Sequence, residues 1–128
     1  MTKAQGEMME RLMRAGFSWS DANTLRRIAM TLHRWAEREC GNDAGCISRD
    51  EATGKPYWES SWGGKPYPIP DREAGALRRL AALLTRYPGW TYYHQGDPRG
   101  AALYLLAPDT INPGESVESL YTRGIAVF

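Results

Sequence analysis

A short polar turn between two apolar runs holds the residues best suited to chemistry in this chain. Within six positions it places an imidazole, an amide, a carboxylate and a guanidinium: His94, Gln95, Asp97 and Arg99. These groups together are able to bind a phosphate or a carboxylate, because a guanidinium pairs with such anions in bidentate geometry. Two residues near the last apolar run are the candidates to complete this ligand site: Tyr121 and Arg123.

The same turn also has the composition of an ordinary hairpin. Asp97 at the first position, Pro98 at the second and Gly100 at the fourth predict a type I turn. This interpretation leaves His94 and Arg99 unexplained. If His94 ends a strand, a bond to Asp97 or to a nearby tyrosine would raise its basicity and fix its tautomer. Both interpretations stay open, with His94 and Arg99 pointing either inward to hold Tyr121 and Arg123 or outward to a partner.

Apolar runs on either side predict the strands that position the turn. Residues 90–95 and 101–106 are apolar on both faces, which is typical of central strands covered by other elements. A further run at 124–128 predicts a terminal strand that needs a sheet to dock on. Ahead of these, leucines and alanines at helical spacing, Ala81 among them, predict a helix over 71–87.

The first seventy residues divide into a helical part and an irregular part. Helical periodicity predicts helices over 7–14 and 20–40. Residues 47–58 indicate a short hairpin, and the Gly, Pro and aromatic content of 60–70 predicts a loop without regular structure. We expect one α+β domain, with N-terminal helices and one central helix packed on a small, mostly antiparallel sheet. Its segments are 1–45, 46–70 and 71–128.

Two groups of side chains are candidates for contacts with a partner. Aromatic residues in or beside the irregular segment either cap the core or anchor an interface, where Trp, Tyr and Arg carry much of the binding energy: Tyr57, Trp58, Trp62 and Tyr67. Arginines seven residues apart on the 71–87 helix either line a solvated face or meet an acidic partner or a phosphate backbone: Arg72, Arg79 and Arg86. Arginines on the 20–40 helix permit the same two interpretations.

Composition and spacing weaken several other chemistries. A net charge of +1 supplies no general attraction to nucleic acid or to an anionic membrane, and no apolar run approaches the roughly 20 residues that cross a bilayer. Zinc has enough ligands in His33, Cys40, Cys46 and His94. However, His33 and Cys40 are seven positions apart, about 10 Å along a helix axis. We expect no metal, no cofactor, reduced thiols and a cytoplasmic location.

Three segments resemble a family of small accessory proteins encoded by tailed bacteriophages and prophages. They are 71–79 (Asp-Arg-Glu-Ala-Gly-Ala-Leu-Arg-Arg), 94–105 (His-Gln-Gly-Asp-Pro-Arg-Gly-Ala-Ala-Leu-Tyr-Leu) and 121–127 (Tyr-Thr-Arg-Gly-Ile-Ala-Val). The family more often has Thr at the position of Gly96 and Cys at that of Ala101, so the turn is looser here. The resemblance covers roughly 25–128 and implies a phage protein acting in the bacterial cytoplasm. It carries no catalytic residues to this chain.

Three classes of function follow from these patterns, and we expect the first. It is a non-enzymatic protein that binds and blocks a host protein, such as a component of a CRISPR-type defence system, through the aromatic loop and the arginine faces. The second is a binder or an enzyme for a small ligand such as a nucleotide, built on His94, Asp97, Arg99, Tyr121 and Arg123. The third is nucleic-acid binding by the arginine rows, with an affinity that falls steeply with salt. The oligomeric state stays open.

Overall fold

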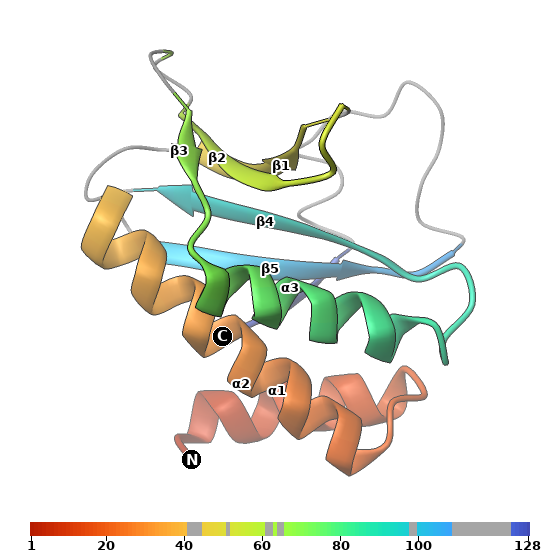
Figure 1. Cartoon of the computed structure of the whole chain (residues 1–128). Coiled ribbons are helices and arrows are strands. Elements are labelled where there is room, and N and C mark those ends of the chain that lie inside the picture. Colours follow the sequence, from red (N-terminus) through yellow and green to blue (C-terminus); the bar gives the residue numbers. More distant parts are fainter. Residues whose placement is uncertain (41–44, 51, 61–62, 64–65, 98–99, 109–123) are drawn as a thin grey trace.

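In the part of the chain that the structure describes, three α-helices form a layer against one face of an antiparallel sheet (Figure 1). The computed structural model describes residues 1–40, 45–50, 52–60, 63, 66–97, 100–108 and 124–128. The helices are α1 (Lys3–Arg14), α2 (Trp19–Trp35), its π-helical continuation η1 (Ala36–Cys40), and α3 (Asp71–Leu84). The strands are β1 (Gly45–Arg49), β2 (Pro56–Ser60), β3 (Tyr67–Pro68), β4 (Thr91–Asp97), β5 (Gly100–Leu106) and β6 (Ile125–Val127). The predicted α+β class is confirmed. None of the described helices combines the length and the apolarity needed to cross a bilayer.

Side chains at the helix starts explain where α1 and α2 begin. Thr2 Oγ1 accepts a hydrogen bond from the Gln5 amide (3.1 Å), and Gln5 Oε1 accepts one from the Thr2 amide (3.0 Å). Because of this capping box, α1 starts before the predicted helix of 7–14. Ser18 Oγ accepts from the Asp21 amide and caps α2.

The described strands pair in the order β3-β2-β1-β4-β5-β6, and every pairing is antiparallel. The hairpin predicted within 47–58 is β1 and β2, and the predicted central strands pair as β4 and β5. The prediction that 60–70 lacks regular structure is wrong in part, because β3 pairs with β2. Two three-stranded halves meet where β1 pairs with β4, at Gly45 with Gly96 and at Cys46 with Gln95.

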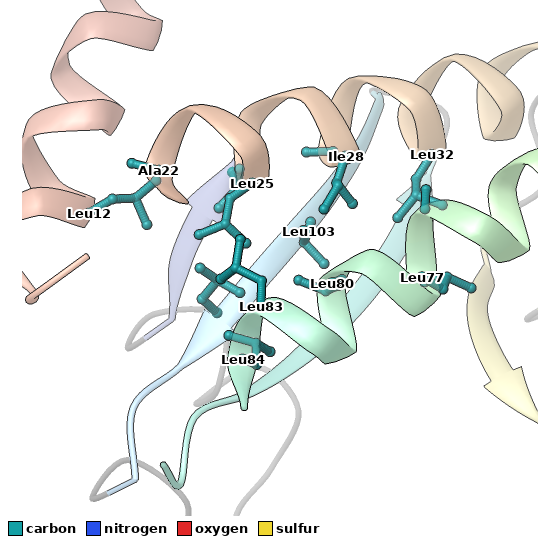
Figure 2. Close-up of a cluster of buried hydrophobic side chains, with 14 of the residues drawn as sticks. Leu12, Ala22, Leu25, Ile28, Leu32, Leu77, Leu80, Leu83, Leu84 and Leu103 are labelled. Carbon is teal, nitrogen blue, oxygen red and sulfur yellow. The ribbon is translucent and has the colours of Figure 1, made fainter. Parts of the chain in front are cut away.

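Apolar side chains of α2 and α3 fill the space between the helices and the sheet (Figure 2). Leucines and an isoleucine from both helices meet the inner face of β5 in this cluster: Leu25, Ile28, Leu32, Leu77, Leu80, Leu83 and Leu103. Burying one such side chain stabilises the fold by about 1.5–3 kcal/mol. Ala81, predicted for the buried stripe of α3, is exposed; Leu83 takes a place in the stripe instead.

A row of inward-facing side chains crosses the sheet beneath the helices. Its members are paired in register or lie on adjacent strands of the same face: Trp58, Ile47, His94, Leu103 and Val127. Gly45 lies against the largest of them. A Cβ atom at Gly45 would come within 2.7 Å of Trp58 Nε1 and would clash with the Glu59 carbonyl oxygen. The absence of a side chain at position 45 therefore makes room for the indole.

Gly45→Ala is expected to destabilise the fold, because the methyl group has no space between Glu59 and the Trp58 indole. Overpacking of this kind costs about 1–3 kcal/mol of unfolding free energy. The matched control is Gly6→Ala on α1, where a Cβ meets nothing within 4 Å and the helix gains up to about 1 kcal/mol. Urea unfolding measures both shifts. A Gly45→Ala protein as stable as the native chain would contradict this packing.

Candidate functional site

The 94–100 turn joins two paired strands, and its one placed polar side chain faces inward. Asp97 of β4 pairs with Gly100 of β5, so residues 98 and 99 connect them. His94 lies in the core and is 1% exposed. The side chains of the other predicted ligand residues lie outside the part that the structure describes: Gln95, Asp97, Arg99, Tyr121 and Arg123. Of the two orientations open for His94, the structure has the inward one.

Burial keeps His94 in its neutral form. Removal from water lowers the pKa of the imidazole to about 4, and the charge of His33 adds to the decrease. Neither ring nitrogen has a hydrogen-bond partner among the described residues. The ring instead contacts Trp58 edge-on, with centroids 5.9 Å apart. The expected rise in basicity is therefore wrong, because no described carboxylate or tyrosine reaches the ring, and His94 packs as a core residue.

Among the side chains that the structure describes, those weighed for zinc form no shared site. His33 Nε2 pairs with Glu37 Oε1 at 2.9 Å on the surface of α2. Cys46 is paired with Gln95, the neighbour of His94; since side chains alternate along a strand, Cys46 and His94 lie on opposite faces of the sheet. The Cys40 side chain is not among those described. Within the described ranges, no three His, Cys, Asp or Glu residues are grouped closely enough to hold a metal ion.

Of the aromatic residues predicted as interface anchors, Trp58 belongs to the core. It is fully buried, because its place on β2 turns the indole toward Trp35 of α2. The interface interpretation is wrong for this residue, and the alternative of a cap over the core is the one that holds. Tyr57 is half-buried, Tyr67 is 44% exposed, and Trp62 lies outside the described residues.

Arg86 does not continue the row of Arg72 and Arg79, because α3 ends at Leu84. Its guanidinium forms an ion pair with Asp21, at the start of α2. Tyr87 donates a second hydrogen bond to the same carboxylate. These two interactions, led by the Tyr87 hydrogen bond, hold the pKa of Asp21 below its usual value. Arg86 thus ties the ends of two helices together and is not free for a partner.

Several other arginines of α2, η1 and α3 line a shared groove. Three adjoining depressions of about 330, 200 and 440 Å³ share lining residues and extend along the two helices. We call this surface the arginine groove; its polar lining is Thr24, Arg27, Thr31, Arg34, Arg38, Arg72, Glu73 and Arg79. Two of the predicted partner-binding residues, Arg72 and Arg79, are therefore brought together with arginines from the preceding helix.

Helical spacing explains why α2 presents its share of the groove on one side. The polar lining residues recur at intervals of three and four, which places them on one helix face: Thr24, Arg27, Thr31, Arg34 and Arg38. The hydroxyl groups of Thr24 and Thr31 donate to main-chain carbonyls of their own helix, at 3.0 and 3.2 Å. The guanidinium groups are consequently the main donors that the groove offers to an anion.

Four guanidinium groups of the groove have no partner within the described part of the chain. Neither a hydrogen bond nor an ion pair engages Arg27, Arg34, Arg72 or Arg79. The nearby acidic residue Glu37 pairs with His33 instead. A cluster of unpaired arginines from two helices is suited to bidentate binding of carboxylate or phosphate groups.

A glutamate at one end of the groove was missed by sequence reasoning. Glu73 is only 5% exposed, and it makes no hydrogen bond or ion pair with any described residue. The signal was present in the sequence, because Glu73 lies four and seven positions before the core residues Leu77 and Leu80. A carboxylate on the apolar stripe of a helix is unusual, since buried charges are normally paired.

No family model, curated protein or solved structure matches this chain. The resemblance to phage accessory proteins therefore stays a prediction, and the candidate site rests on the geometry of the arginine groove.

The buried His94 predicts a specific dependence of stability on pH. Its pKa of about 4 in the folded state lies below the ordinary 6.5 of an unfolded chain, so between these values the unfolded state binds more protons. Above pH 6.5 the imidazole is neutral in both states, and the free energy of unfolding has its full value. As the pH falls from 6.5 toward 4, protonation of the unfolded state lowers that free energy. From pH 7.5 to pH 5, native stability is expected to fall by about 2 kcal/mol more than that of His94→Leu.

Chemical unfolding at the two pH values measures this difference. His33→Gln is the control, and it is expected to keep most of the pH dependence because burial is the larger cause of the shift. Equal pH dependence in the native protein and in His94→Leu would show that His94 is solvated or hydrogen-bonded in solution.

Proposed function

We propose that this chain is a small non-enzymatic binding protein that docks an acidic surface of a partner protein in its arginine groove. The observation that carries the proposal is the convergence on one surface of four guanidinium groups from α2 and α3 that have no partner among the described residues. Arginine is the residue best suited to such contacts, because its planar fork binds carboxylates in pairs of hydrogen bonds.

Overall charge and composition favour a protein over nucleic acid as the partner. The net charge is +1, so the chain lacks the long-range attraction that draws proteins to polyanions. Thirteen of the sixteen basic residues are arginines, and arginine is enriched at protein interfaces while lysine is depleted. The exposed ring of Tyr67 adds an aromatic anchor at one end of the groove.

The setting of this binding is proposed from the resemblance to phage accessory proteins. In that setting the chain acts in the bacterial cytoplasm, and its partner is a host protein, such as a component of an anti-phage defence system. The neutral, enclosed state of His94 supports binding over catalysis at the 94–100 turn, because a buried imidazole without partners is not poised for proton transfer.

Reversing two groove charges tests the proposal. Arg27→Glu with Arg79→Glu is expected to weaken capture of the partner from bacterial lysate at least ten-fold, because two attractive contacts become repulsive. The matched control is Arg11→Glu with Arg14→Glu, the same change of charge on exposed positions of α1. Capture is measured by quantitative mass spectrometry, with circular dichroism confirming that both variants fold.

Two outcomes would contradict the proposal. One is equal capture of the same protein by the native chain and the groove variant. The other is a captured complex that nuclease treatment dissolves, which would assign the groove to nucleic acid instead.

A further inference from the structure

One end of the arginine groove is a pocket built from three parts of the chain. The end of α2 with η1, strand β3 and the first turn of α3 all contribute to its wall, and its volume is about 440 Å³. Figure 1 shows the chain passing from β3 into the start of α3 here. We call it the Glu73 pocket; its lining includes Trp35, Arg38, Tyr67, Pro68, Arg72 and Glu73.

The carboxylate of Glu73 is the feature of this pocket that calls for a ligand. The residue is almost fully buried and has no partner among the described residues. Its oxygens are nevertheless not among the enclosed, unpartnered polar atoms, which belong to Trp58 and His94; the carboxylate therefore reaches the pocket that it lines. A mostly buried carboxylate that opens only into this pocket depends on water there for its hydrogen bonds, and a ligand that donates hydrogen bonds to it would replace that water.

The charges around Glu73 restrict the kind of donor that fits. Arg38 and Arg72 line the same pocket and repel a cationic donor such as an ammonium group. A neutral group with N–H donors avoids this repulsion. The same two arginines favour a ligand that also carries an anion, because the pocket as a whole is positive. The pocket therefore suits a ligand that has neutral N–H donors along one edge and also carries an acidic group.

The walls of the pocket favour a flat ligand. The exposed ring of Tyr67, with Pro68 and Trp35 beside it, supplies the kind of surface on which nucleobases stack. Among the common bases, guanine alone presents two adjacent N–H donors, at N1 and at the 2-amino group. Adenine, cytosine and uracil place an acceptor beside each donor, and a carboxylate repels that acceptor.

Arg72, in the first turn of α3, provides a place for a phosphate. Asp71 and Glu73 put two carboxylates in the same turn, so the guanidinium and not the helix start is the group that would bind the anion. Arg72 lies in that first turn, is exposed and has no described partner. Base and phosphate of one nucleotide would thus meet groups only one turn of helix apart.

We infer that the Glu73 pocket binds a guanine nucleotide, with Glu73 accepting from N1–H and the 2-amino group while Arg72 holds the phosphate. This function goes beyond the proposed protein docking and uses a different part of the groove. Arg27→Glu with Arg79→Glu should weaken docking at least ten-fold and leave nucleotide binding unchanged, because neither residue lines the Glu73 pocket; the two proposals therefore fail separately.

Isothermal titration of the native protein with four 5′-monophosphates tests the inference directly. Guanosine monophosphate is expected to bind, and inosine monophosphate, which lacks the 2-amino donor, to bind about ten-fold more weakly. Adenosine and cytidine monophosphates are expected to bind at least 100-fold more weakly. Equal affinity for the guanosine and adenosine nucleotides, or no binding of guanosine monophosphate at millimolar concentration, would overturn the inference.

A conservative variant then locates the site. Glu73→Gln keeps the shape of the side chain but replaces one acceptor oxygen with an N–H donor, and it is expected to weaken guanosine monophosphate binding at least ten-fold. Glu10→Gln, an exposed change on α1, is the control and should bind as the native chain does. Unchanged binding by Glu73→Gln, with guanine selectivity retained, would place the nucleotide elsewhere and overturn the assignment.

Discussion

The packing of Trp58 is the interaction on which the rest of this structure depends. Among the described residues, the two halves of the sheet are joined by two residue pairs between β1 and β4, and the Trp58 indole lies across that junction. Its ring contacts His94 of β4 and Trp35 of α2, with centroids 5.9 Å apart in both cases. Gly45 leaves the space that this ring occupies. One side chain thus couples both halves of the sheet to the end of α2.

Trp35 connects this packing to the Glu73 pocket. Its ring packs against Trp58, and the same residue lines the pocket. At the opposite end of α2, Asp21 binds Arg86 and Tyr87 just after α3. α2 is therefore held at both ends: Trp35 packs against the sheet at one end, and Asp21 binds the segment after α3 at the other. A groove between helices fixed in this way presents its guanidinium groups at set separations, which lowers the entropy cost of binding.

Much of the fold follows from local sequence patterns, whereas the site does not. The β4–β5 hairpin is marked by apolar runs on either side of turn residues, and the β1–β2 hairpin by the turn-forming residues between its strands. The alternation of β4 shows that His94 and Gln95 face opposite ways, but it cannot show which face the helices cover. The arginines of α2 and α3 share a groove only because the helices pack side by side, and spacing within one helix carries no information about its neighbour. Glu73 was detectable, since it interrupts an apolar stripe.

The proposed docking places the partner on the arginine groove and not on the far end of the β1–β2 hairpin. Site-specific photo-crosslinking tests it most directly, with benzoylphenylalanine placed at Thr31 inside the groove or at Thr53 on the exposed hairpin turn. Both positions are threonines, so the two variants change the chain by the same substitution. Docking in the groove predicts a crosslink to a bacterial protein from position 31 and none from position 53. A crosslink from position 53 alone would contradict it.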